Sequence, residues 1–274
     1  MKALLQTDTI GRVPMPPAFL AGYDTEQPMC IEAVRHVVEI HRRLRIPATF
    51  FLVGTLVEHN REELKRLLLD ELFEIGNHTY THFHVQLNPP KAGREQVLRT
   101  QDLLEEVFGC RPVGFRTPGG MEEGYRGEAE RLAIFADLGF QYISSQSWGP
   151  NGKMPAPVIP PYTYADDGFG ELLEVPVHGW HENLWTKVHP WQDPLGKIVP
   201  DAPQSIEDWL APFLQEMNQV IEQSFPYYGP TMHPWSLRRF HPQCRQAERL
   251  LSIARDRGMV FMKFSEFAQR WKAS

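Results

Sequence analysis

Two closely spaced histidines and two closely spaced carboxylates are the side chains of this sequence best suited to metal chemistry. Residues 76–82 read Gly-Asn-His-Thr-Tyr-Thr-His, so His78 and His82 are four positions apart. On a helical turn, residues at this spacing share one face, and both imidazoles could reach one cation. Asp24 and Glu26 follow an apolar run and would point to the same side of an extended strand. Two histidines with one carboxylate leave positions for water, which is typical of catalytic rather than structural metal sites.

Each of these residues also has a simpler structural interpretation. A histidine pair at this spacing can arise by coincidence on a surface, because the chain has 11 histidines. Glu26 could be a solvated surface carboxylate. Asp24 could cap a helix that begins near Ile31, but it lies too far upstream for that role. Which of the two carboxylates binds metal, Asp24 or Glu26, therefore stays open.

The composition indicates a folded protein with a large core. The chain has 274 residues, 42% of them hydrophobic, which fits one α/β barrel, and we expect a single domain over residues 1–274. Lys and Arg number 28 against 34 Asp and Glu, and the formal net charge is −6. Because the sequence has no basic tract, nucleic acid is not an expected partner.

Cysteine usage and hydropathy bear on the compartment. Cys30, Cys110 and Cys244 lie far apart without paired spacing, which favours buried free thiols over disulfides or a thiolate zinc site. Residues 1–17 lack the apolar run of a secretory signal, and no later segment is long enough to span a membrane. We therefore expect a cytoplasmic protein without a membrane partner.

Strand-like and helix-like stretches alternate along the chain. This alternation predicts parallel strands with right-handed crossovers, and so a barrel-like α/β domain. After a first strand that ends near Asp24, the predicted strands are 48–53, 113–116, 142–144, 172–176, 229–233 and 260–262. The predicted helices are 30–44, 62–70, 94–108, 128–138, 206–224 and 243–257, and residues 265–271 close the chain.

The candidate chemical side chains each follow a predicted strand. They are Asp24 with Glu26, His78, Arg116, the segment 144–148 and His233. In parallel barrels, active sites gather at the carboxyl ends of the strands. Five separate segments that obey this rule indicate one site better than any single residue does.

These segments, in this order, resemble the NodB-homology polysaccharide deacetylases (carbohydrate esterase family four) over about residues 18–270. His78 to His82 matches the family's His-Ser/Thr-x-x-His motif, and Arg116-Thr117-Pro118-Gly119 matches its Arg-x-Pro-x-Gly motif. The resemblance implies an α/β fold, namely a distorted (β/α) barrel with fewer than eight parallel strands. It also implies a metal-dependent hydrolase of non-peptide C–N bonds.

Residues near the end of the sequence indicate which subgroup of this family the chain resembles. Residues 231–233 resemble the late strand that ends in the family's catalytic histidine, here His233. The phrase His233-Pro234, followed by Arg239, is more similar to an intracellular subgroup with peptidoglycan-deacetylase-like and allantoinase-like members.

Two positions depart from the family pattern. Secreted members carry two adjacent aspartates on the first strand, whereas this chain has Asp24-Thr25 with the second carboxylate at Glu26. In the fourth motif an Asp and a Trp are expected, but residues 144–148 read Ser-Ser-Gln-Ser-Trp. Trp148 keeps an aromatic wall there, and the charged partner is lost.

The resemblance implies a role for each catalytic candidate. Asp24 would act as general base on water, and Arg116 would keep it ionised and oriented, since a guanidinium favours a nearby carboxylate. His233 would act as general acid on the leaving nitrogen. The metal would be a divalent ion, zinc in the first place, with cobalt, nickel or iron as alternatives.

We expect the substrate to contact Pro118, Trp148 and Trp180. Trp180 belongs to a cluster of alternating Trp and His that also includes His178, His181, Trp185, His189 and Trp191. This cluster could form a wall on which sugars stack. It could equally form a subunit contact in a homo-oligomer, because Trp is enriched in interfaces.

Three functions remain open at this point. The leading hypothesis is deacetylation of an N-acetylated sugar or polysaccharide. The alternative is hydrolysis of a cyclic amide or ureide, as in allantoinase-like enzymes, or deformylation. A third is a catalytically inactive relative that binds carbohydrate, motivated by the altered first and fourth motifs.

Overall fold

The strands of the computed structural model, which describes residues 16–186 and 202–273, form one large and one small sheet. The order in the large sheet is β10 (Thr231–Met232), β2 (Gly22–Thr25), β3 (Ala48–Leu52), β4 (Phe73–Asn77), β5 (Gly114–Met121), β6 (Tyr142–Gln146), β8 (Phe169–Glu174) and β7 (Tyr162–Tyr164). Among these described strands, β7 pairs antiparallel with β8 and the other seven are parallel.

The small sheet adjoins strands β10 and β2 of the large sheet. Its strands β11 (Val260–Phe261), β1 (Ala18–Phe19) and β9 (Tyr227–Tyr228) are parallel. β1 leads into β2 and β9 into β10, so the same chain segments run through both sheets. After β8, the His178 N–H donates to the carbonyl of Gly229 at 3.0 Å and joins the two sides. The result is a distorted (β/α) barrel with fewer than eight parallel strands in its main sheet, which confirms the predicted fold class.

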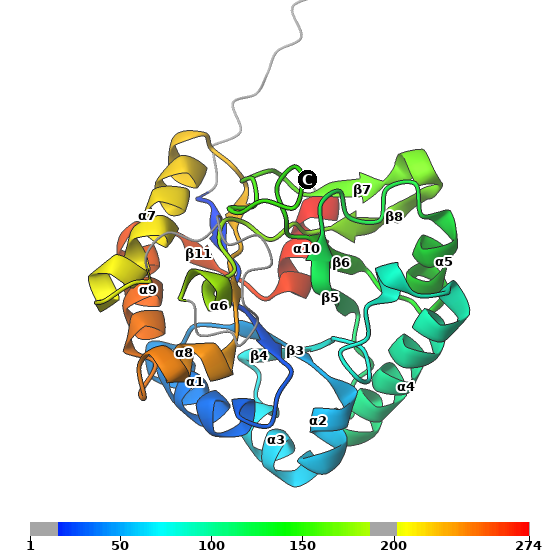
Figure 1. Cartoon of the computed structure of the whole chain (residues 1–274), viewed down its shortest axis with the longest axis horizontal. Helices are drawn as coiled ribbons and strands as arrows, with labels where there is room; N and C mark the ends of the chain where they lie inside the picture. Colours follow the sequence, from blue (N-terminus) through cyan, green and yellow to red (C-terminus); the bar gives the residue numbers. More distant parts are fainter. Residues whose placement is uncertain (1–15, 187–201, 274) are drawn as a thin grey trace, which may run out of the picture.

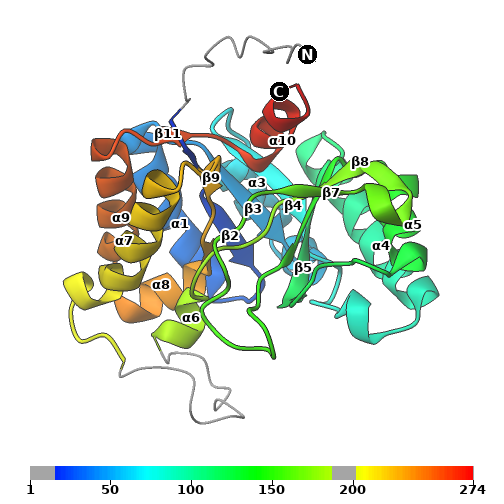
Figure 2. The ribbon, with the colours of Figure 1, turned by 90° about the horizontal axis from the view of Figure 1, so that it is seen from above.

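Helices form the outer layer of this barrel (Figure 1). They are α1 (Cys30–Leu44), α2 (Gly54–His59), α3 (Arg61–Leu68), α4 (Pro90–Phe108), α5 (Ala129–Asp137), α7 (Ile206–Glu222), α8 (Pro234–Phe240) and α9 (Arg245–Asp256). The helices α6 (Glu182–Trp185) and α10 (Phe264–Lys272) lie inside this ring in the view of Figure 1. Figure 2 shows strands β2 to β5 between α1 and α8 on one flank and α4 and α5 on the other.

The pattern of α1 explains why the longer helices were predicted well. Val34, Val37 and Val38 recur at helical spacing and are buried against the sheet, while the opposite face is exposed. Arg45 then adopts a left-handed conformation, with φ of 52°, and ends the helix at Leu44. The bounds agree with the predicted helix over 30–44.

Short elements were the ones that sequence periodicity did not predict. They include α2, α6, α8 and β7, which lies at the end of the proline-rich loop before residue 162. An element of three to seven residues offers too few positions for a helical or strand period to be recognised.

Two further expectations concern regions away from the strand ends. Cys30 and Cys244 are buried free thiols, but Cys110 is exposed just after the end of α4, so the expectation of burial is wrong for this residue. Within residues 16–186 and 202–273, no helix combines the length and the apolar character needed to cross a bilayer.

Candidate metal centre

The end of β2 supplies the first carboxylate of the candidate site. Glu26 follows this strand, and its side chain is only 8% exposed. Its Oε2 lies 2.8 Å from Nε2 of His82 and 3.9 Å from Nε2 of His78. Ligand atoms of these three residues all lie within 4.8 Å of one another, a spacing that one cation could bridge.

The two histidines lie in a sharp turn after β4, whereas their spacing of four suggested one turn of a helix. β4 ends at Asn77, and the next residues turn sharply because Thr79 and His82 take left-handed conformations, with φ of 60° and 56°. Asn77 Oδ1 accepts the backbone N–H of Thr79, and Thr79 Oγ1 accepts that of Phe83. The rings of His78 and His82 still converge, with centroids 5.0 Å apart.

The hydrogen bonds of His78 leave one nitrogen ready for a metal. Its Nδ1 lies 2.8 Å from the carbonyl oxygen of Arg116, which can only accept, so Nδ1 carries the hydrogen. Nε2 therefore bears the lone pair, and within the described chain this buried atom has no hydrogen-bond partner. Burial lowers the pKa of His78 to about 4 and keeps the ring neutral. This donor set fits a divalent ion of the zinc type.

Glu26 is held in place from its other oxygen. The indole N–H of Trp235 donates to Oε1 at 3.0 Å, which leaves Oε2 directed at the histidines. Burial alone would raise the pKa of Glu26, but the hydrogen bond with His82 and the positive charge of the nearby His233 bring this pKa well below the usual range. Glu26 is thus an ionised oxygen ligand facing two imidazoles.

Asp24 lies beside this group and contacts Arg116. Its Oδ1 is 3.3 Å from Nη1 of Arg116, which also donates to the hydroxyl of Thr231 at 2.6 Å. The guanidinium lies over the rings of Phe51 and Phe264, 4.4 and 5.3 Å from their centroids. The structure brings Asp24 to Arg116, while Glu26 is the carboxylate grouped with the histidines.

A glycine makes room for the buried guanidinium. A Cβ atom added at Gly22 would lie 3.0 Å from Nη2 of Arg116, closer than side chains normally approach. Gly22 therefore allows Arg116 to pass next to β2 and reach Asp24.

His233 lies on the opposite side of Asp24, at the junction of β10 and α8. Its Nε2 is 3.9 Å from Oδ2 of Asp24, and its Nδ1 is 3.0 Å from Oε1 of Glu182. Burial opposes its charge, but the hydrogen bond with Glu182 and the nearby Glu26 and Asp24 raise the pKa of His233 to about 9. The ring is therefore protonated at neutral pH.

Glu182 is the site residue that the sequence did not reveal. It is fully buried and contacts His233 from 51 positions away. No motif or spacing marks it. The sequence signal that could have led to it is indirect, namely the lost charged partner in residues 144–148.

The predicted substrate residues fall into two groups. The ring of Trp148 lies next to that of His181, with centroids 5.2 Å apart and planes tilted by 49°. The indole N–H of Trp148 donates to the carbonyl of Gly119, next to Pro118. Trp180 instead pairs with Trp185 at 5.5 Å. His189 and Trp191 of the predicted cluster lie outside the described residues.

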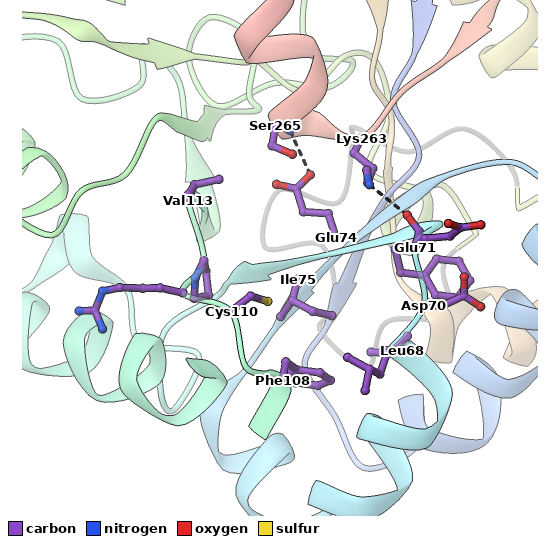
Figure 3. A pocket seen from close by; sticks show the side chains of 14 residues that line it. Leu68, Asp70, Glu71, Glu74, Ile75, Phe108, Cys110, Val113, Lys263 and Ser265 are labelled. Atoms are coloured by element: carbon purple, nitrogen blue, oxygen red, sulfur yellow. Dashed lines mark hydrogen bonds between the residues drawn. The ribbon is translucent and has the colours of Figure 1, made fainter. Parts of the chain in front are cut away.

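A pocket of about 540 Å³ lies at the other end of β4 and is separate from this centre (Figure 3). Glu74, Cys110, Lys263 and Ser265 are among its lining residues. Glu74 is the second residue of β4, and the end of this strand leads to His78, so the pocket and the histidine turn lie at opposite ends of β4. The catalytic candidates are therefore not part of this pocket.

Comparison with known proteins adds a family to this geometry. Residues 23–143 match the family model described as polysaccharide deacetylase, and this segment includes Asp24, Glu26, His78 and His82. The peptidoglycan-N-acetylmuramic acid deacetylase PdaC of Bacillus subtilis is 31% identical over 107 residues, which are 39% of this chain and 22% of that protein. The chain spans less than half of the length of such curated relatives.

Solved structures extend the likeness to the whole barrel. A provisionally assigned polysaccharide deacetylase from Mycobacterium smegmatis superposes with a TM-score of 0.72 and 19% identity, covering 95% of this chain and 91% of that one. The Puue allantoinase superposes with a TM-score of 0.66 and 16% identity, covering 88% and 72%. Together, the family match over residues 23–143 and the shared fold show that the chain is similar to the NodB-homology polysaccharide deacetylases.

Proposed function

We propose that the protein is a metal-dependent deacetylase that hydrolyses the amide of an N-acetylated sugar or polysaccharide. The observation that carries this proposal is the convergence of Glu26, His78 and His82 next to Asp24 and His233. The deacetylase relatives, whose names specify N-acetylated amino sugars, support the substrate class.

Glu26, His78 and His82 would hold the ion. When bound there, a zinc, cobalt, nickel or iron ion supplies a Lewis acid that polarises the acyl carbonyl and makes water a stronger nucleophile at neutral pH. His78 contributes Nε2, because its Nδ1 is committed to the carbonyl of Arg116. His82 and Glu26 would supply the other two protein ligands, and a site with three protein ligands would leave coordination positions for substrate or water.

Asp24 and His233 divide the proton transfers between them. Asp24, oriented by Arg116, takes a proton from the attacking water as general base. His233, protonated at neutral pH, gives a proton from Nε2 to the leaving nitrogen as general acid. A base and an acid that lie side by side in different environments match the needs of amide hydrolysis.

Trp148, His181 and Pro118 would form the wall for the sugar. The indole of Trp148 offers an apolar face on which a pyranose ring can stack, and its N–H is already bonded to the backbone. Trp180, which pairs with Trp185, would extend this wall or serve a subunit contact.

The test is acetate release by the zinc-loaded protein from chitooligosaccharides and from peptidoglycan fragments. We expect acetate and free amine in equal amounts, with no release after the metal is removed by a chelator and recovery when zinc is restored. Ring opening of allantoin or other cyclic amides in the same screen, without acetate release, would favour the amidohydrolase alternative. Binding of the oligosaccharide without turnover of any substrate would favour the inactive relative.

A further inference from the structure

His181 lies between the aromatic wall of the site and the two residues assigned to proton transfer. On one side, its ring is next to that of Trp148, with centroids 5.2 Å apart and planes tilted by 49°. On the other side, the charges of His233 and Asp24 act on the His181 ring, and the next residue in the chain, Glu182, contacts His233 at 3.0 Å. A sugar that stacks on the indole with its amide at the reacting groups would therefore pass His181.

The backbone determines which nitrogen of His181 carries a hydrogen. Nε2 lies 3.0 Å from the carbonyl oxygen of Ser147, which can only accept, so Nε2 is the donor. Burial, reinforced by the positive charge of His233, lowers the pKa of His181 to about 4, and the ring is neutral at neutral pH. The lone pair is then on Nδ1. Among the described residues none is hydrogen-bonded to this atom, and the side chain is only partly buried.

A lone pair in this position needs a hydrogen-bond donor, and a substrate can bring one. The ligand atoms that converge on one point for a cation belong to Glu26, His78 and His82, and His181 is not among them. A neutral imidazole nitrogen without hydrogen can only accept, so its partner must be an O–H or N–H group. A pyranose ring that stacks on an indole presents its equatorial hydroxyls at the ring edge. One of these hydroxyls is on the carbon next to the acetamido group.

We propose that His181 is a specificity residue whose Nδ1 accepts a hydrogen bond from the free hydroxyl next to the N-acetyl group of the sugar. This inference rests on the proposed function and narrows its substrate class to N-acetylglucosamine-type units. An N-acetylmuramic acid unit carries a lactyl ether at the same oxygen, so it has no hydrogen to donate there and brings a carboxylate toward a lone pair. A site built to bond a hydroxyl discriminates against an analogue without it, because the acceptor is then left unpaired.

The experiment compares two substrates of the zinc-loaded full-length protein. They are chitotetraose and a deoxy analogue in which hydrogen replaces the hydroxyl next to each N-acetyl group. We expect kcat/KM of the wild type to be about 10- to 100-fold lower on the deoxy analogue. His181→Phe keeps a planar ring beside Trp148 but removes the acceptor, so it should show the same loss on chitotetraose and no further loss on the deoxy analogue.

Two further variants sharpen this comparison. His181→Gln offers an acceptor oxygen and should recover part of the rate on chitotetraose. His59→Phe is the matched control, because it replaces an exposed histidine of α2 and should change neither rate. If His181 were only a part of the wall, His181→Phe would lower both rates by the same factor. That result, or unchanged rates on both substrates, would overturn the inference.

Calorimetric titration of the two sugars separates this inference from the proposed function. We expect the wild type to bind chitotetraose more tightly than the deoxy analogue, and His181→Phe to bind the two sugars equally. A zinc-loaded wild type that shows this difference in binding but releases no acetate would refute the proposed function alone. Equal affinities of the wild type for the two sugars, or no binding of either, would refute the role of His181.

Discussion

The two ends of strand β4 both carry buried polar side chains, but they differ in how completely these are hydrogen-bonded. At the start of the strand, Glu74 accepts from the hydroxyls of Thr49 and Tyr142 and from the backbone N–H of Ser265, at 2.9 to 3.0 Å. Burial raises the pKa of this carboxyl, and the three donors oppose that shift. This end of the barrel is a closed polar network.

At the other end of β4, the hydrogen bonds of the buried polar side chains are incomplete. His78 bonds to Arg116 through Nδ1, whereas its Nε2 finds no hydrogen-bond partner among residues 16–186 and 202–273 and faces Glu26 and His82. Buried polar atoms in folded proteins are nearly always paired, so an unpaired nitrogen beside an ionised carboxylate indicates a place for a ligand. The fully hydrogen-bonded cluster around Glu74 supports the fold. The cluster around His78, where an unpaired nitrogen faces Glu26 and His82, is instead suited to binding a ligand.

Replacing His78 with alanine should disrupt the candidate metal centre and give the largest effect on zinc binding and activity. Because Lewis-acid assistance is worth several kcal/mol, we expect zinc content to fall and acetate release to drop by at least about 10³-fold. The measurement is metal analysis together with the rate of acetate release. His59→Ala on α2 is the control, since that exposed ring bonds only to the carbonyl of Thr55 in the described structure. A His78→Ala protein that keeps its zinc would show that the ligand assignment is wrong.

Much of the fold was accessible from sequence because long amphipathic helices and buried strands repeat their signals. The helix at 30–44 was predicted with its observed bounds, and Asp24, His78, Arg116 and His233 were each expected after a strand. Strand ends in a parallel barrel converge on one side, so position in the alternation carried most of the information about the site.

The local geometry of the site was less accessible. A spacing of four between His78 and His82 fits a helix, but it fits equally a turn with two left-handed residues, and neither Thr79 nor His82 has the glycine that usually signals such a turn. Glu182 was missed for another reason. Its contact with His233 spans 51 positions and depends on tertiary packing, which the sequence pattern does not encode. It supplies a carboxylate where residues 144–148 lack one.

Trp235→Phe should weaken zinc binding at Glu26, His78 and His82 without abolishing it. The change removes the indole N–H that holds Oε1 of Glu26 while it keeps an aromatic ring. Outer hydrogen bonds to ligands are worth about 10- to 100-fold in metal affinity, so we expect the zinc dissociation constant to rise within that range and kcat at saturating zinc to change little. Competition with a chelator of known affinity measures the constant. Trp209→Phe, which removes a buried core indole, controls for packing. Equal affinities of wild type and Trp235→Phe would contradict the role of Trp235.

The pH dependence of the reaction tests the role of His233 as general acid. Because the pKa of His233 is raised to about 9, its proton is available throughout the neutral range, and kcat/KM should fall about tenfold for each pH unit above 9. The same shift stabilises the folded state. The contribution of His233 to the free energy of unfolding is fully present below pH 6.5, the ordinary pKa of histidine, and is lost as the pH rises through about 9. A rate that stays constant through pH 10 would exclude His233 as the general acid.

Glu74→Gln tests the closed end, where the smallest effect on catalysis is expected. The amide group cannot accept from all three donors, so we expect a loss of about 1–3 kcal/mol in the free energy of unfolding and an unchanged rate of acetate release. Since the pKa of Glu74 is raised in the folded state, its stabilising contribution is complete below pH 4.5 and decreases as the pH rises through the folded value. The stability difference between wild type and variant should therefore narrow with increasing pH in denaturant titrations. A variant that unfolds normally but loses activity would mean that the two ends of β4 are coupled, because a purely structural network cannot change the rate without changing stability.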